Sequence, residues 1–290
     1  MKRPSWFAII AFALAYALSG CQTQPSGPGT GGLSALSREQ LVEKINANNQ
    51  RIPTLWARIN LRADIRNPDT GKRTTVYADH GYLFYRAPGE LRLRADKDVA
   101  GLLLDLGINT QRYWVIAPEP GPDTMWWGNV QAEPQRSEIP LRPQDMLEIL
   151  AIRPIDVAGP DAPKLQYSQK DKAYMLIWYR QVAGRYFVSR EIFYDPDTLL
   201  PKTVLLFAAD GSLALRANLT DHGQVDSPTK PEPRMAREYE LLLPESRSRA
   251  ELRLLNMTIS RESVPNDASF RFPEKRSVAK EKQIDAHVPK

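Results

Sequence analysis

The residue types that most often hold metals or attack substrates are few in this chain of 290 residues. It has three histidines, His80, His222 and His287, which lie far apart, and one cysteine, Cys21. A zinc or iron–sulfur site needs three or four converging ligands, and the sequence has neither a C-x-x-C nor an H-x-x-x-H spacing. A single cysteine also excludes an intramolecular disulfide. We therefore expect no metal site and no cofactor.

Sequence motifs of common catalytic sites are missing as well. There is no G-x-S-x-G elbow, no G-x-x-x-x-G-K-[ST] loop and no G-x-G-x-x-G after a predicted strand. Asp195 and Asp197 flank Pro196 in a predicted turn, where carboxylates usually accept hydrogen bonds from backbone amides. A paired acid and base would need a cleft, which a hairpin tip rarely provides. We expect no catalytic residues and no enzymatic activity.

The single cysteine stands in a distinctive context. The chain begins with a basic Lys2-Arg3 pair, continues with an apolar run over 6–18 and reaches Cys21 through Ser19 and Gly20. The run is shorter than the roughly 20 residues that a helix needs to span a bilayer. A basic start, a short apolar core and small residues before a cleavage point are typical of a secretory signal peptide.

Residues 18–21 (LSGC) resemble the bacterial lipobox. The resemblance implies a signal peptide at 1–20, cleavage before Cys21 and a diacylglycerol on its thiol. Residues 21–32 then form a flexible linker rich in Gly, Pro, Ser and Thr, and two or three acyl chains give stable membrane attachment. Gln22, in place of Asp, favours the outer membrane of the cell envelope, with the protein facing the periplasm. The alternative is an ordinary signal or anchor with an incidental cysteine.

Composition and charge describe a globular protein without a nucleic-acid-binding surface. Hydrophobic residues make up 42% and charged residues 25% of the chain, which suits one large or two small domains. The formal charge is +5, and removing Lys2 and Arg3 with the signal peptide leaves 5 − 2 = +3. The arginines are scattered between apolar neighbours and form no basic patch. We expect no nucleic-acid partner, and we expect a monomer.

The hydrophobic pattern changes from helical to alternating near Pro53. A helix is predicted from Ser37, which with Gln40 forms a potential capping box, and a second helix over 142–150 carries Leu147 on its apolar face. In 57–66 every odd position is apolar or small and every even one polar, which is typical of a half-buried strand. Further strands are predicted at 74–85, 90–95, 101–106, 112–117, 125–128, 165–168, 173–181, 185–194, 201–208, 213–220, 236–243 and 250–260.

Turn residues between these runs indicate sequential antiparallel strands. Ala183-Gly184 and Asp210-Gly211 each join two alternating segments. We expect one domain over 33–272, an exposed loop at 221–234 and a disordered tail at 273–290. A mainly β sheet of this size curls into a barrel or half-barrel, and two helices can cover its concave side without filling it. Such an arrangement leaves room for an apolar cavity.

Three stretches carry a resemblance to the LolA/LolB-like superfamily. They are residues 81–93 (GYLFYRAPGELRL), 112–115 (RYWV) and 141–150 (LRPQDMLEIL), together with Tyr194-Asp195 ahead of Leu200-Pro201. The resemblance covers nearly all of 33–272. It implies an incomplete antiparallel barrel of about eleven strands capped by helices, with a cavity that binds acyl chains of lipoproteins or lipids for transport or localisation. The anchored member displays a bulky apolar residue on a loop; the corresponding stretch here is 96–100, where Val99 departs from that pattern because it is small.

Cavity candidates follow from the assumption that the apolar face of each strand is the concave one. The ordinary alternative for each is a core residue without ligand contact. The candidate residues are Ile59, Leu61, Ile65, Leu91, Leu93, Leu103, Trp114, Trp127, Leu147, Val188 and Ile192. Arginines at alternate positions, such as Arg58 and Arg92, are predicted to form a solvated sheet face or to meet anionic head groups.

A second function is compatible with the same pattern. Trp126 and Trp127 are adjacent in a predicted strand, so their side chains point to opposite faces and one of them must leave the core. That residue could meet solvent, a helix or a partner. The protein could then be a structural or sensory lipoprotein in which this pair and the 221–234 loop contact another protein.

Overall fold

The computed structural model describes residues 36–66, 71–97, 101–117, 124–132, 141–259, 265–273, 278 and 280–284. The described residues from Ser37 onward belong to one compact unit. Cys21, the predicted signal peptide 1–20, the linker 21–32 and Val99 lie outside the described residues and remain predictions. Within the described part of the chain, no helix has the length and hydrophobicity needed to cross a membrane.

The first described helix, α2 (Arg38–Asn49), begins at the predicted capping box. Ser37 Oγ accepts a hydrogen bond from the backbone N–H of Gln40 at 3.2 Å, and the backbone N–H of Ser37 donates to Gln40 Oε1 at 3.0 Å. Two of the backbone donors that a helix start leaves without partners are thereby satisfied. Leu41, Val42 and Ile45 form the buried face of the helix.

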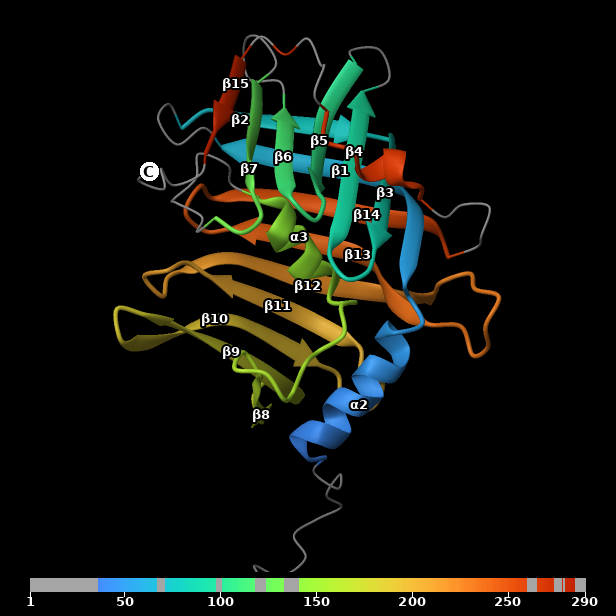
Figure 1. The fold of residues 1–290 in the computed structure, drawn as a ribbon, viewed down its shortest axis with the longest axis vertical. Helices are drawn as coiled ribbons and strands as arrows, with labels where there is room; N and C mark the ends of the chain where they lie inside the picture. The colour runs from blue at the N-terminus through green and yellow to red at the C-terminus, as the bar shows by residue number, and fades with distance from the viewer. Residues whose placement is uncertain are drawn as a thin grey trace, which may run out of the picture. The chain divides into compact units, whose positions relative to one another are not determined.

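Helix α3 (Pro143–Leu150) also matches its predicted position. Pro143 suits the first turn because it has no N–H to satisfy there. Asp145 accepts a hydrogen bond from the backbone N–H of Arg142 at 3.1 Å, and the helix ends at Ala151, whose φ is 53°. The helix packs mainly against four strands, β4, β5, β6 and β11, and lies in the middle of the curved sheet (Figure 1).

All the described strands belong to one mainly antiparallel sheet. They are β1 (Thr54–Arg66), β2 (Arg73–Ala78), β3 (His80–Arg86), β4 (Glu90–Lys97), β5 (Gly101–Ile108), β6 (Arg112–Ala117), β7 (Thr124–Asn129), β8 (Lys164–Ser168), β9 (Ala173–Val182), β10 (Arg185–Tyr194), β11 (Pro201–Phe207), β12 (Leu213–Gln224), β13 (Arg234–Leu243), β14 (Ser248–Thr258) and β15 (Lys280–Gln283). The order is β15-β7-β6-β5-β4-β3-β1-β14-β13-β12-β11-β10-β9-β8, with β2 beside β1. Among the described strands, β15 and β8 stand at the two ends of this order and do not pair with each other, so the curled sheet is unclosed.

The described residues contain more strands than the roughly eleven that the family resemblance implies. The run predicted as one strand at 74–85 divides at Asp79 into β2 and β3, which pair with opposite ends of β1. Residues 280–283, in the segment predicted as a disordered tail, form β15 and pair in parallel with β7. The predicted loop 221–234 is shorter, because β12 continues to Gln224 and β13 begins at Arg234. Val225 is fully buried beyond the end of β12.

The strand register defines one continuous buried face. Paired residues share a face, and the pairs connect Ile192 through Val204, Ala217, Leu241, Ala250 and Ala63 of successive strands. Ala57 lies on the same side of β1 as Ala63, and its pairs continue through Leu83, Leu93, Leu106 and Val115 to Trp126. We call this the inner face and the opposite side the outer face. Leu147 of α3 lines a pocket together with Ile192, so α3 covers the inner face.

Candidate ligand pocket on the inner face

The residues predicted to line a cavity do not all lie on the same face of the sheet. Six of the eleven belong to the inner face or to the helix that covers it: Ile59, Leu61, Leu91, Leu93, Leu147 and Ile192. Ile59 and Leu91 are 0% exposed, so they pack as core. Leu147 and Ile192 line a described pocket. Ile65 differs from the expectation, because it is 47% exposed near the end of β1, opposite Thr74 of the short strand β2.

Trp114 and Trp127 lie on the outer face, contrary to the expectation of a shared cavity with Leu93. Trp114 pairs with Trp127 and with Gly107, whereas the neighbouring Leu106 belongs to the inner face. Phe272 packs edge-on against both rings, with each centroid separation at 5.8 Å. The two tryptophans therefore belong to a second apolar cluster. Its other members are Ile116 and Met125, with Leu102, Phe272 and Val278 packed against them.

The adjacent tryptophans follow strand alternation, but the sheet is covered on both sides at this position. Trp126 is 7% exposed on the inner face, and Trp127 is half-buried on the outer face beneath Phe272. The outward residue thus meets another segment of the same chain. Neither tryptophan forms the open contact surface that the second predicted function requires.

Two β-bulges change the expected positions of Val188 and Leu103. Val188 pairs with Tyr179 and Arg190 pairs with Trp178, so the register shifts at Ser189. Tyr179 and Trp178 are consecutive and face opposite ways, which places Val188 on the outer face, away from Ile192. Leu103 is buried at the bulge where Ala95 pairs with Leu104 and Asp96 with Leu102. Alternation alone could not detect either shift.

A pocket of about 280 Å³ lies between α3, the segment that follows it, and the inner face of β9 and β10. Its apolar wall includes Leu147, Trp178 and Ile192, and the buried Tyr194 also lines it. Burial raises the pKa of Tyr194, so its phenol stays neutral. The remaining lining residues are Glu148, Ala151, Arg153, Pro154, Ile155, Asp156, Gly159, Pro160, Asp161 and Arg190.

Arg190 gives the pocket wall a positive charge among apolar groups. Its guanidinium lies 3.9 Å from the centre of the Trp178 ring and forms an ion pair with Glu148 of α3. Glu148 also accepts a hydrogen bond from Arg153 at 3.0 Å. Burial lowers the pKa of Arg190 to about 10, which leaves it protonated at neutral pH. Sequence reasoning missed Arg190. A usable signal was present, because Arg190 is a charged residue at a position two before Ile192, where strand alternation expects an apolar one.

This arrangement suits noncovalent binding of an apolar chain with one polar end. Leu147, Trp178 and Ile192 offer apolar surface, while Arg190 and Arg153 can donate hydrogen bonds to oxygen acceptors. Asp156 and Asp161 lie exposed at the rim. Among the described residues there is no group of three or more His, Cys, Asp or Glu side chains placed to hold a metal ion.

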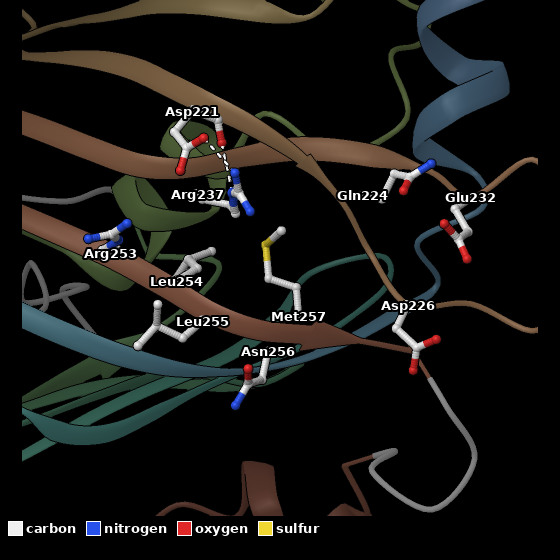
Figure 2. A pocket seen from close by; sticks show the side chains of 10 residues that line it. All are labelled: Asp221, Gln224, Asp226, Glu232, Arg237, Arg253, Leu254, Leu255, Asn256 and Met257. Carbon is white, nitrogen blue, oxygen red and sulfur yellow. Dashed lines mark hydrogen bonds and ion pairs between the residues drawn. The ribbon is translucent and has the colours of Figure 1, made fainter.

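A larger pocket, of about 440 Å³, is lined by residues of the predicted 221–234 loop and of β14 (Figure 2). It opens where the pairing of β13 with β14 ends at Glu238 and Arg253. Arg237 donates a hydrogen bond to Asp221 at 2.6 Å, and this contact lowers the pKa of the Asp221 carboxyl. Met257 supplies part of an apolar floor. The charged lining makes this pocket a poor match for an acyl chain.

Solved structures share this fold at low sequence identity. A LolA superfamily protein from Nitrosomonas europaea aligns with 82% of this chain and 99% of its own, at a TM-score of 0.51 and 11% identity. A DUF1329 family protein from Desulfovibrio piger aligns over 81% and 95%, with a TM-score of 0.53 and 12% identity. A putative outer membrane lipoprotein-sorting protein domain from Vibrio parahaemolyticus aligns over 81% and 97%, with a TM-score of 0.50 and 9% identity.

These similarities show that the chain has a LolA/LolB-like fold, as the sequence resemblance implied. No protein-family model matches the sequence, and no curated protein matches it.

Proposed function

We propose that this protein is an envelope lipoprotein that binds acyl chains of lipoproteins or lipids for transport or localisation to the outer membrane. A lipid on Cys21 attaches it to the membrane, facing the periplasm. The pocket between α3 and the β9–β10 hairpin receives part of the chain. The observation that carries the proposal is an apolar wall of Leu147, Trp178 and Ile192 on the inner face of a LolA/LolB-like sheet.

The size and lining of the pocket support a transfer role. Its volume of about 280 Å³ lies at the lower limit of small-molecule sites, which is roughly 300 Å³. Part of one acyl chain fits, and each buried methylene contributes about 0.8 kcal/mol. Because the pocket buries fewer methylenes than a membrane does, it holds the chain more weakly, so a bound ligand can leave for the membrane. The lipoprotein-sorting name of the Vibrio structure agrees with this role.

Mass spectrometry of protein purified in mild detergent tests the proposal. We expect lipid or acylated peptide to co-purify with the wild type. Ile192→Trp fills the pocket from β10 and should remove most of the bound lipid. Val188→Trp is the matched control, because the bulge at Ser189 places this side chain on the outer face of the same strand. Absence of lipid from the wild type, or equal lipid in both folded variants, would contradict the proposal.

The pocket in Figure 2 favours a second candidate function, a structural or sensory lipoprotein that binds another protein. Arg253 lies at the edge of this pocket with half of its side chain exposed, 3.5 Å from Glu238. A protein partner would meet charges here and Met257 beneath them. Pull-down from membranes separates the candidates, since a carrier yields lipid or many lipoproteins and a scaffold yields one defined partner that Arg253→Glu releases.

A further inference from the structure

The tip of the β9–β10 hairpin exposes large hydrophobic side chains. Tyr186 is 73% exposed, Tyr179 41% and Val182 37%. These are three of the six exposed large hydrophobic residues in the described part of the chain, and they lie within residues 179–186. Figure 1 shows the turn between β9 and β10 at one side of the sheet, away from α2. Such a concentration at one tip calls for a function.

The same tip is positively charged. Residues 179–188 (YRQVAGRYFV) contain Arg180 and Arg185 and no acidic residue. Arg185 is exposed, whereas Arg180 donates a hydrogen bond to the backbone carbonyl of Phe207 at 2.6 Å. Asp210 lies near Arg180 on the neighbouring β11–β12 turn, where it accepts a hydrogen bond from Ser212 Oγ at 2.6 Å. The outermost charge of the hairpin is therefore Arg185.

The exposed groups lie on both faces of the two-stranded tip. Tyr186 pairs with Gln181 on the outer face, which also carries Tyr179. Val182 pairs with Arg185 on the inner face. A protein partner that packs against one face would leave the other exposed. An environment that surrounds the tip, such as a layer of lipid head groups, covers both faces at once.

We propose that the β9–β10 tip docks into the head-group layer of an anionic membrane. Tyrosine is favoured at membrane interfaces because its ring is apolar and its hydroxyl stays hydrated. Arg185 adds attraction to lipid phosphates. The inner-face pairs Val182–Arg185, Arg180–Phe187 and Trp178–Arg190 then lead from the membrane surface toward the pocket. This inference goes beyond the acyl-chain proposal, because docking requires only the exposed tip.

An environment-sensitive dye at Gln181→Cys tests the docking. Gln181 is exposed at the tip, and labelling it leaves the tyrosines and Arg185 intact. The full chain is reconstituted into vesicles of phosphatidylglycerol with phosphatidylethanolamine, or of phosphatidylcholine alone. We expect a blue shift of the dye emission on the anionic vesicles only. The same dye at Asp197→Cys, on the turn at the other end of β10, should show no shift.

Charge and ring variants of the labelled chain sharpen the test. Combining Arg185→Glu with Tyr186→Ser should raise the anionic-lipid fraction needed for half the shift by roughly tenfold. Lys202→Glu makes the same charge change at an exposed site beyond the other end of β10 and should leave the shift unchanged. An equal shift at both label positions, no shift at position 181, or a shift that requires added envelope proteins overturns the proposal.

The unsubstituted chain keeps this test separate from the other proposals. It has one cysteine, so dye uptake by this chain reports an unmodified Cys21. Failure of lipidation is thereby distinguished from failure of docking. Lipid that co-purifies with the unlabelled protein reports on the pocket independently of the dye.

Discussion

The β4–β7 region and the β9–β10 hairpin show how similar strand patterns acquire different roles. In β4–β7 the sheet is covered on both faces, by α3 inside and by Phe272 and Val278 outside. In β9–β10 the inner wall faces a pocket, and the tip exposes Tyr186. Alternation sets the two faces of each strand, but segments distant in sequence decide whether a face becomes core, pocket or surface. The binding that we propose thus uses the region that is less completely covered.

The largest effect is expected from removing a charge that is buried on the outer face of β5, in the region that is covered on both faces. Asp105 is 0% exposed and accepts two hydrogen bonds from Arg92, at 3.0 and 2.8 Å. Asp105→Ala leaves the Arg92 charge buried without its partner and should lower the free energy of unfolding by about 3–5 kcal/mol in urea denaturation. Asp96→Ala, which breaks the half-buried and more exposed pair with Arg94, should cost less, about 1 kcal/mol. Equal losses would contradict burial of the outer face.

A smaller effect is expected where Trp114 crosses Gly107. A Cβ at position 107 would lie 2.1 Å from an atom of the Trp114 ring. Gly107→Ala should therefore displace the ring and lower the free energy of unfolding by roughly 1–3 kcal/mol, with a change in near-ultraviolet circular dichroism. Gly89→Ala is the matched control, since nothing lies within 4 Å of its added Cβ. An unchanged spectrum for Gly107→Ala would show that Trp114 lies elsewhere.

A substitution at the tip of the β9–β10 hairpin should leave the free energy of unfolding almost unchanged. Tyr186 is 73% exposed, so Tyr186→Ser should change the free energy of unfolding by less than about 0.5 kcal/mol. The measurement is the urea midpoint of the protein in detergent, without vesicles. A loss above 1 kcal/mol would mean that the tip packs against the fold and is not free to dock.

The smallest expected effect is a pH dependence in the half of the sheet that holds the pocket. Burial lowers the pKa of His222 on β12 below its usual 6.5, and its Nε2 lies 2.8 Å from the Pro201 carbonyl oxygen. The unfolded chain then binds the proton more readily, so stability is lost as pH falls below 6.5. Arg234 opposes protonation, whereas Asp195 and Asp221 favour it.

Urea midpoints at pH 7.5 and 5.5 measure this contribution. We expect the wild type to lose more stability than His222→Gln over this interval. The variant keeps a polar side chain but has no proton to gain. Parallel losses in the two proteins would show that His222 is accessible to protons in the folded state.

Local sequence patterns predicted most of the secondary structure. They did not predict which segments pack against each face of the sheet. Residues 112–117 and 185–194 form strands with the predicted bounds, and Gly184 has the positive φ that its turn requires. The cover of Trp114 on the outer face depends on Phe272, which lies more than 150 residues along the chain in a segment with few apolar residues. The bulge at Ser189 reversed Val188 without a sequence signal. Arg190, in contrast, had a sequence signal, because it is a charged residue at a position where alternation predicts an apolar one.

The central claim is that an acyl chain lies between α3 and β10, and photo-crosslinking tests it most directly. A fatty acid with a photoreactive diazirine on its chain is incubated with the full protein, irradiated and mapped by peptide mass spectrometry. We predict adducts in 143–150 and 190–194, reduced in Ile192→Trp and retained in Val188→Trp. Adducts confined to the outer-face cluster around Trp114 and Trp127, or no adducts on the folded protein, would contradict the account.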